Sequence, residues 1–316
     1  MEAIAGLFGI DPFDLWFFVE VFVGGLMSGV MYSLVALGFV LIFKASSVFN
    51  FAQGVMVLFA ALNFVGFLNI FEGMGALPIW LVVVIAFILT MVVMILLAIA
   101  VERVVLRPLV NQPHISLFMS TIGIAFFLEG FGELIWGSNI KPLDVGISQD
   151  VTFLGDAMIQ DSDITAAVIA SFLVAVLALF FHYTRIGRAL RAVADDHQAA
   201  LSVGIPLNHI WIIVWSVAGF VALVAGIMWG SALGVQFSLS ILALKALPVL
   251  ILGGFTSIPG AIIGGLIIGA GEKLAEVYMG SFFGGAIEEW FAYIVAMAFL
   301  FFRPQGLFGE KIIERV

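Results

Sequence analysis

Apolar stretches long enough for membrane helices alternate with short polar linkers along the whole chain of 316 residues. Nine such segments can be distinguished: Trp16–Phe43, Phe51–Phe71, Leu77–Val101, Ile115–Trp136, Ile164–Tyr183, Ile210–Leu233, Ile241–Phe255, Ile262–Gly271 and Trp290–Phe302. A helix needs about 20 apolar residues to cross a bilayer, and most of the segments reach that length. The pattern predicts an all-α polytopic membrane protein, formed as a single transmembrane domain over residues 1–316.

The number of crossings depends on two short segments that flank Ser257–Pro259. Ile241–Phe255 carries Lys245 and Pro248, and Ile262–Gly271 is extended on both sides only by small residues. If every segment crosses, there are nine transmembrane helices. If one short segment enters and leaves by the same face, there are eight. We therefore predict about eight or nine helices, with broken or short segments near residues 50 and 257.

Composition agrees with this pattern and excludes several classes of protein. Hydrophobic residues make up 63% of the chain and charged residues 10%, whereas a soluble domain carries roughly 25% charged residues. A soluble enzyme and a disordered chain are therefore excluded, and the net charge of −9 would repel nucleic acid. The chain has no cysteine, so it has no disulfide framework and no thiolate metal site.

The few charges predict the orientation, because basic residues mark cytoplasmic loops. Nine of the twelve basic residues follow segments that would end inside: Lys44, Arg103, Arg107, Arg185, Arg188, Arg191, Arg303, Lys311 and Arg315. The loop over residues 137–163 has one Lys and five Asp, so we predict an acidic external loop there. The N-terminus is then outside and the C-terminus cytoplasmic.

Two polar interruptions of the apolar pattern are candidates for a translocation path, because paired interruptions in the two halves of a transporter point to a substrate path. The first contains Asn50, Gln53 and Gly54, and the second contains Thr256, Ser257 and Pro259. At the first, Asn50 is also a good helix N-cap, and at the second a tight turn between helices explains the pattern equally well. Both interpretations remain open at this point.

The linker over residues 185–209 combines basic residues with helix-ending signals. Arg185, Arg188 and Arg191 recur every three residues, and Gly204 and Pro206 follow. We expect a helix of roughly 15 residues on the cytoplasmic side. It could be held by anionic lipid headgroups or could dock a soluble partner.

Intramembrane acids are functional candidates by default, and Glu129 and Glu133 lie four residues apart in the fourth segment. An interfacial position near the outer surface is the simpler interpretation. The four histidines make no metal-ligand pattern. The sequence also contains no G-x-x-x-x-G-K-[ST] phosphate loop and no nucleophile elbow or H-E-x-x-H motif, so we expect no enzyme activity and no bound cofactor.

Three stretches and a tail together resemble the permease subunits of high-affinity branched-chain amino acid ABC importers, of the LivH type. The stretches are GLMSGVMYSLVALGFVLIFKASSVFNFAQG (25–54), RIGRALRAVADDHQAALSVGI (185–205) and LKALPVLILGGFTSIPGAIIGGLIIGAGE (244–272), followed by RPQGLFG (303–309). The resemblance runs over nearly the whole chain.

The resemblance implies a multi-pass protein of the bacterial cytoplasmic (inner) membrane that works with partners. These are a second related permease, two ATP-binding cassette subunits that hydrolyse ATP, and an extracytoplasmic substrate-binding protein. ABC importers often carry E-A-A-x-x-x-G in the docking loop, and this chain has Gln198, Ala199, Ala200 and Gly204 there, with Gln in place of Glu. The resemblance thus favours residues 185–209 as the coupling loop for the ATPase.

The implied function is ATP-driven import of branched-chain or related amino acids by alternating access. A permease of the same family for urea, amides or other small polar solutes is an alternative. A stand-alone secondary transporter or channel that uses Glu129 or Glu133 as a proton-linked acid is an alternative of another class.

Overall fold

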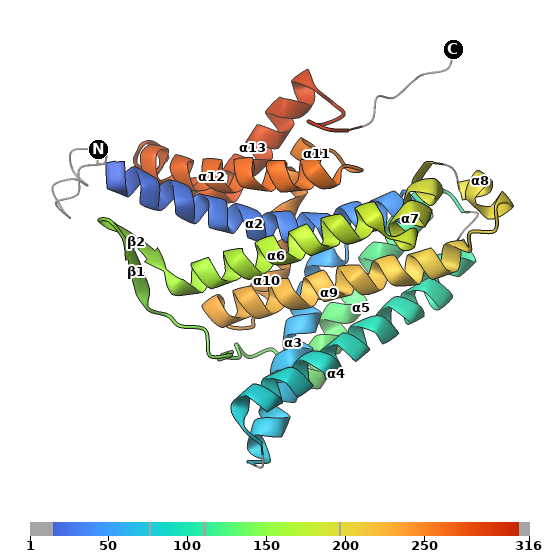
Figure 1. Cartoon of the computed structure of the whole chain (residues 1–316), viewed down its shortest axis with the longest axis horizontal. Helices are drawn as coiled ribbons and strands as arrows, with labels where there is room; N and C mark the ends of the chain where they lie inside the picture. Colours follow the sequence, from blue (N-terminus) through green and yellow to red (C-terminus); the bar gives the residue numbers. More distant parts are fainter. Residues whose placement is uncertain (1–14, 76, 110–111, 196, 310–316) are drawn as a thin grey trace. The chain divides into compact units, whose positions relative to one another are not determined.

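A computed structural model describes residues 15–309 except 76, 110–111 and 196, and it is helical almost throughout (Figure 1). Its helices are α2 (Leu15–Ser46), α3 (Gln53–Gly73), α4 (Ile79–Ala100), α5 (His114–Trp136), α6 (Asp161–Tyr183), α7 (Arg185–Asp195), α8 (His197–Ser202), α9 (Leu207–Leu233), α10 (Ser238–Leu244), α11 (Ala246–Gly253), α12 (Ile258–Phe283) and α13 (Ile287–Phe302). A π-helical turn (Val101–Leu106) and a 3-10 turn (Arg107–Leu109) extend α4. Two antiparallel strands, β1 (Val151–Leu154) and β2 (Ala157–Gln160), form a hairpin.

The all-α polytopic fold predicted from the apolar pattern is confirmed. All nine apolar segments are helical, and seven of the described helices are long and apolar enough to cross a membrane: α2, α3, α4 with its extension, α5, α6, α9 and α12. The predicted interruptions are present as well, because no helix covers residues 47–52 or 254–257. The remaining apolar length lies in α10 with α11, and in α13, which has 16 residues.

One local expectation was wrong, and the structure adds detail to two others. The segment Ile262–Gly271, expected to be short, belongs to a helix of 26 residues, because its glycines are packed inside a helix pair. The helix of roughly 15 residues expected after Arg185 corresponds to α7 and α8, which lie on either side of residue 196, a position outside the described residues. The loop over residues 137–163 contains the β hairpin, and its last residues begin α6. The chain ends, 1–14 and 310–316, lie outside the described residues, and the orientation stays a prediction.

The chain forms two compact units. One unit contains the first part of α2 up to Ala36, residues Gly146–Val174, and the chain from Lys245 onward. The other contains Leu37–Val145 and Ala175–Leu244. Helices α2 and α6 each contribute to both units, and each unit is described by itself below.

In the unit formed by Leu37–Val145 and Ala175–Leu244, α3 is the central element. It packs against α4, α5, α9 and α10 (Figure 1), and an uninterrupted run of its residues, Gln53–Gly66, is buried. Small residues permit the close approach of α3 to α9, since a Cβ at Gly226 would lie 2.7 Å from the carbonyl oxygen of Val57. A helix that is apolar on every side, as α3 is, is expected at the centre of a bundle.

In the other unit, the glycines that are spaced four apart in α2 and α12 meet each other. A Cβ at Gly29 would lie 2.5 Å from the carbonyl oxygen of Gly265, and a Cβ at Gly25 would lie 2.8 Å from that of Gly269. Such pairs of small residues let helix backbones approach closely in lipid. The hydroxyl of Ser33 donates to the carbonyl oxygen of Ile262 at 3.1 Å across the same interface.

Candidate functional site

The first interruption is organised by two fully buried amide side chains. Asn50 Oδ1 accepts a hydrogen bond from the backbone N–H of Ala52 at 3.1 Å, and its Nδ2 donates to Gln53 Oε1 at 3.4 Å. Gln53 Nε2 donates in turn to the carbonyl oxygen of Ala218 on α9 at 3.3 Å. The N-cap position of α3 is Ala52, which gives no side-chain hydrogen bond. Asn50 is therefore not the N-cap residue, and its side chain instead stabilises the turn that precedes α3. Irregular backbone in a membrane protein needs such internal partners.

A threonine that the sequence analysis did not single out holds the other side of this turn. Thr121 on α5 is fully buried, and its hydroxyl accepts from the backbone N–H of Phe51 at 3.1 Å and lies 3.3 Å from the carbonyl oxygen of Phe49. A single Thr in an apolar helix has no distinguishing sequence signal, because hydroxyls in membrane helices usually bond to their own helix. Together, Asn50, Gln53 and Thr121 fix the turn between α2 and α3; we call them the polar turn cluster.

A cavity of about 350 Å³ lies between α3, α5 and α10, beside this turn. Its lining includes the predicted path residue Gly54, and a Cβ at Gly54 would lie only 2.5 Å from the carbonyl oxygen of Ser240. The lining is mostly apolar, with three polar side chains: Glu129 from α5 and the serines Ser238 and Ser240 from α10. An apolar pocket with a few convergent polar groups is the usual form of a small-molecule site.

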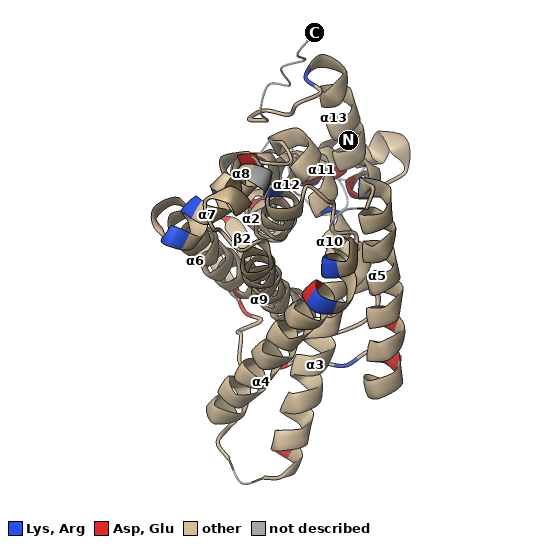
Figure 2. Ribbon diagram, turned by 90° about the vertical axis from the view of Figure 1, so that its right-hand side faces the viewer, with Lys and Arg blue, Asp and Glu red and all other residues tan. Residues whose placement is uncertain are grey.

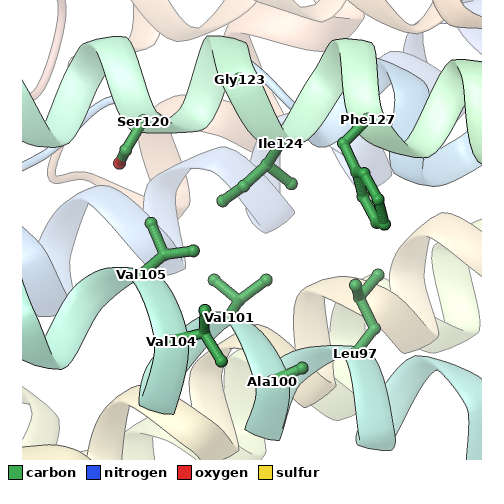
Figure 3. Close-up of a pocket in the computed structure, with 9 residues that line it drawn as sticks. All are labelled: Leu97, Ala100, Val101, Val104, Val105, Ser120, Gly123, Ile124 and Phe127. Atoms are coloured by element: carbon green, nitrogen blue, oxygen red, sulfur yellow. The ribbon is translucent and has the colours of Figure 1, made fainter.

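A second cavity, of about 450 Å³, has a different character (Figure 3). Val101, Val104 and Leu97 from the α4 end and its π-helical turn face Ile124 and Phe127 of α5 across it. Its single polar side chain, Ser120, donates its hydroxyl hydrogen bond to the carbonyl oxygen of Leu117 within α5. This cavity therefore offers apolar contact alone and has no side-chain group for the charged ends of an amino acid.

The second interruption is a tight turn supported by the chain that follows α13. Ser257 caps α12 by accepting from the backbone N–H of Gly260 at 3.0 Å, and Gly254 has a φ of 103° that favours glycine. The N–H groups of Leu307 and Phe308 donate to the last carbonyl oxygens of α11, at Leu252 and Gly253. Ser257 is buried, Thr256 is half-buried and Pro259 is exposed. The turn interpretation thus accounts for the local pattern.

The two interruptions belong to different units, with Asn50, Gln53 and Gly54 in one and Thr256, Ser257 and Pro259 in the other. Within its own unit, the structure brings the first three together around the polar turn cluster and the cavity. Whether any of the six contacts substrate stays a prediction.

The predicted docking arginines lie on α7 at its sharp junction with α6 (Figure 2). Arg191 donates to the carbonyl oxygens of Phe181 and His182 at 2.8 and 3.2 Å, and Arg188 donates to that of Tyr183 at 3.1 Å. Arginine side chains commonly satisfy the last carbonyls of a helix in this way. Gly187 is required here, because a Cβ would collide with the carbonyl group of Phe181.

The remaining docking candidates lie around the short helix α8. Arg185 and Ala199 are exposed, Ala200 is buried, and Gly204 has a φ of 84°. The side chain of Gln198 lies outside the described residues. Arg185 makes no hydrogen bond or ion pair within the part of the chain that the structure describes. It is thus the one of the three candidate arginines that makes no hydrogen bond within the described residues.

The unit that contains α12 and α13 holds a network of charged side chains that the sequence analysis did not predict. Lys245, at the joint between α10 and α11, contacts Glu272 Oε1 at 2.6 Å and donates to the carbonyl oxygen of Glu288 at 3.3 Å. Lys273 pairs with Glu288 at 3.0 Å. Glu272 lies near the middle of α12 and its side chain is 2% exposed. Intramembrane acids and bases are usually paired with each other, but the partner cannot be identified from one-dimensional spacing.

Comparison with known proteins places the chain in a family. The family model described as "Branched-chain amino acid transport system / permease component" matches residues 21–303. The chain is 28% identical to the high-affinity branched-chain amino acid transport system permease protein LivH of Salmonella typhimurium over 95% of this chain and 98% of that protein. It is also 28% identical to the corresponding permease protein BraD of Pseudomonas aeruginosa over 96% of this chain and 99% of that protein. A probable branched-chain amino acid transport permease protein of Methanocaldococcus jannaschii is 28% identical over 87% of this chain and 88% of that protein.

These matches extend over both units and over both polar interruptions. With seven apolar helices of spanning length, they indicate a multi-pass protein of the inner membrane. The chain therefore belongs to the family of permease components of branched-chain amino acid transport systems.

Proposed function

We propose that this chain is the membrane-spanning subunit of an ATP-driven importer for branched-chain or related amino acids. The observation that carries the proposal is the near full-length similarity to permease proteins named for that transport, in a chain with seven apolar helices of spanning length. Alternating access would move substrate through a passage that this chain forms with a second, related permease.

We assign ATP hydrolysis to two partner ATP-binding cassette subunits, and substrate delivery to an extracytoplasmic binding protein. The sequence has no phosphate loop of the G-x-x-x-x-G-K-[ST] type, which agrees with this division. The permease then acts without a cofactor of its own and without catalytic residues.

We further assign coupling to α7 and α8. Two features support it: α7 buries Gly187, Leu190 and Val193 on one face, and Arg185 and Arg188 are exposed on the same helix. Arg191 donates hydrogen bonds to two carbonyl oxygens at the α6–α7 junction, so its guanidinium group already has partners within the chain. Transmission of movement from a docked ATPase to α6 would pass through this rigid junction.

The proposal is tested with the complete transporter purified and reconstituted in liposomes. We expect leucine uptake that requires ATP and the binding protein, with ATP hydrolysis stimulated by the loaded binding protein. Uptake by this chain alone without ATP would instead support a secondary transporter or channel, and a binding protein that holds urea or an amide would redirect the substrate assignment.

Docking is tested by charge reversal on the exposed face of α7. The double change Arg185→Glu and Arg188→Glu should remove most of the stimulated ATP hydrolysis, because charged pairs across an interface set both association and register. The matched control is Arg303→Glu, an exposed arginine that is also predicted to be cytoplasmic but lies after α13. Normal co-purification and normal stimulated hydrolysis in the double variant would contradict the docking assignment.

A further inference from the structure

The carboxylate of Glu129 is the one polar group of the cavity between α3, α5 and α10 that carries a charge. It is partly buried, and it makes no hydrogen bond or ion pair with any residue that the structure describes. By contrast, the three acids of the α12–α13 network, Glu272, Glu276 and Glu288, all accept hydrogen bonds. Within the described residues, Glu129 is thus an acidic side chain without a partner.

A carboxylate without a partner is unusual at the position of Glu129, which lies well inside a membrane-spanning helix. It lies seven residues before the end of α5 at Trp136, which at 1.5 Å per residue is roughly 10 Å along the helix. Glu133, one turn further on, is exposed and lies close to that end. An ionised carboxylate is costly against lipid and normally faces protein or a water-filled cavity. The carboxylate is therefore expected to face water inside the cavity rather than lipid, with the apolar side chains of Phe126 and Ile241 exposed beside it.

The rest of the lining defines what Glu129 could bind. The hydroxyl of Ser240 donates to the carbonyl oxygen of Phe237 at 2.8 Å, which leaves its oxygen free to accept. Around these groups stand the apolar side chains of Val55, Ile241 and Leu244. No cationic side chain lines the cavity. The chemistry fits a ligand with a positive, hydrogen-donating end and an aliphatic body.

A metal ion fits less well, because a single carboxylate with serine hydroxyls is a poor ligand set, and no group of three potential ligands occurs in the described part of the chain. An aliphatic amino acid fits both halves of the lining, with its ammonium on the acid, its side chain on the apolar wall and its carboxylate toward the exposed side of the cavity, away from Glu129. The volume of about 350 Å³ is within the roughly 300–1,000 Å³ range of small-molecule pockets.

We propose that this cavity is a substrate subsite in which Glu129 binds the α-ammonium group of an aliphatic amino acid and Val55, Ile241 and Leu244 contact its side chain. The inference rests on the proposed function for the choice of ligand. It gives Glu129 a role as a binding residue, in place of the proton-linked acid of a secondary transporter.

The natural absence of cysteine from the chain permits a direct binding test that does not depend on transport. Ser238 is an exposed residue of the lining, so Ser238→Cys places a single reporter thiol at the cavity. In the complete complex, a small water-soluble methanethiosulfonate should modify this thiol, as detected by the mass of this subunit. Saturating leucine should slow the modification severalfold, whereas 4-methylpentanoate, which has the same aliphatic body without the ammonium group, should not.

The reporter is then combined with changes of the two acids. Glu129→Gln should abolish protection by leucine, and Glu133→Gln should retain it, because only Glu129 lines the cavity. In uptake measurements with saturating loaded binding protein, Glu129→Gln should lower the rate roughly tenfold or more, since hydrogen bonds to charged groups are worth about 1.5–3 kcal/mol. Co-purification of the partner subunits checks that the variant is folded.

The outcomes separate this inference from the proposed function. A thiol at Ser238 that does not react, equal protection by both ligands, or protection that survives Glu129→Gln would each overturn the subsite. Protection by leucine in a complex that does not transport it would keep the subsite and reject the importer assignment. ATP-driven leucine uptake that is unchanged by Glu129→Gln would reject the subsite and keep the importer.

Discussion

At the scale of single residues, the polar side chains inside this apolar protein fall into two kinds. The polar turn cluster and the Lys245–Glu272 pair are internally bonded, so they hold broken backbone and helix joints in place. Glu129 has no such partner among the residues that the structure describes. The difference could not be predicted from the sequence, because Asn50, Lys245 and Glu129 are all isolated polar residues in apolar surroundings and only their three-dimensional neighbours distinguish them.

Removal of one partner from the Lys245–Glu272 pair should be far more harmful than removal of both. Lys245→Met leaves a carboxylate that is 2% exposed without its counter-charge, and we expect a loss of about 3–5 kcal/mol in the free energy of unfolding. The double change Lys245→Met and Glu272→Leu should recover most of that loss, because well-packed apolar residues often replace a buried ion pair at little cost. The measurement is thermal unfolding of the purified protein.

The matched control for that pair lies one residue further along α12. Lys273 and Glu288 are 45% and 37% exposed, so Lys273→Met should change the free energy of unfolding by less than about 1 kcal/mol. A double variant at Lys245 and Glu272 that is as unstable as the single one would show that the charges themselves are needed there.

At the scale of elements, glycine position decides which helices meet. Gly25 and Gly29 are spaced four residues apart in the sequence, and the structure places both of them against α12. The sequence did not reveal that α12 is the helix that packs against these glycines. Glycine is common throughout the chain, and a four-residue spacing does not identify the partner helix. Similarly, the junction between α6 and α7 depends on how Gly187 and Arg191 fit the end of α6, which helix propensity alone does not describe.

Two neighbouring glycines of α2 give a test of this contact. Gly29→Ala would push a Cβ to 2.5 Å from the carbonyl oxygen of Gly265, and overpacking of this kind typically costs 1–3 kcal/mol. Gly24 has no atom within 4 Å of an added Cβ, so Gly24→Ala should leave stability unchanged or raise it by up to about 1 kcal/mol through helix propensity. Melting temperatures of the two purified variants provide the comparison, and equal values would refute the contact.

At the scale of the whole molecule, the few charges serve as an orientation signal. The acidic residues over 137–163 and the arginines of α7 predict opposite sides of the membrane. The family assignment adds the expectation of partners on both sides. The asymmetry of charge was readable without a structure because it depends on loop composition alone.

Orientation can be measured with single cysteines in a chain that has none of its own. Asp156, in the turn of the β hairpin, and Asp195, at the end of α7, are both exposed. In intact cells, an impermeant maleimide should label Asp156→Cys and should label Asp195→Cys only after permeabilisation. The reverse pattern would invert the predicted topology, and labelling of both from outside would show that the two sites share a side.

The sequence by itself determined that this is a polytopic helical membrane protein, where most of its long helices, α12 excepted, run to within a few residues, and which transport family it resembles. These properties depend on local hydrophobicity, on short-range spacing and on long matching stretches, all of which are linear in the chain. Tertiary structure alone decided that Thr121 bonds to the backbone of the first interruption, that Lys245 pairs with Glu272, and that Glu129 lines a cavity without a partner in the described part of the chain. Each of these depends on residues far apart in the sequence, and the free energy of a buried polar group is set by the partner that folding brings within hydrogen-bonding distance.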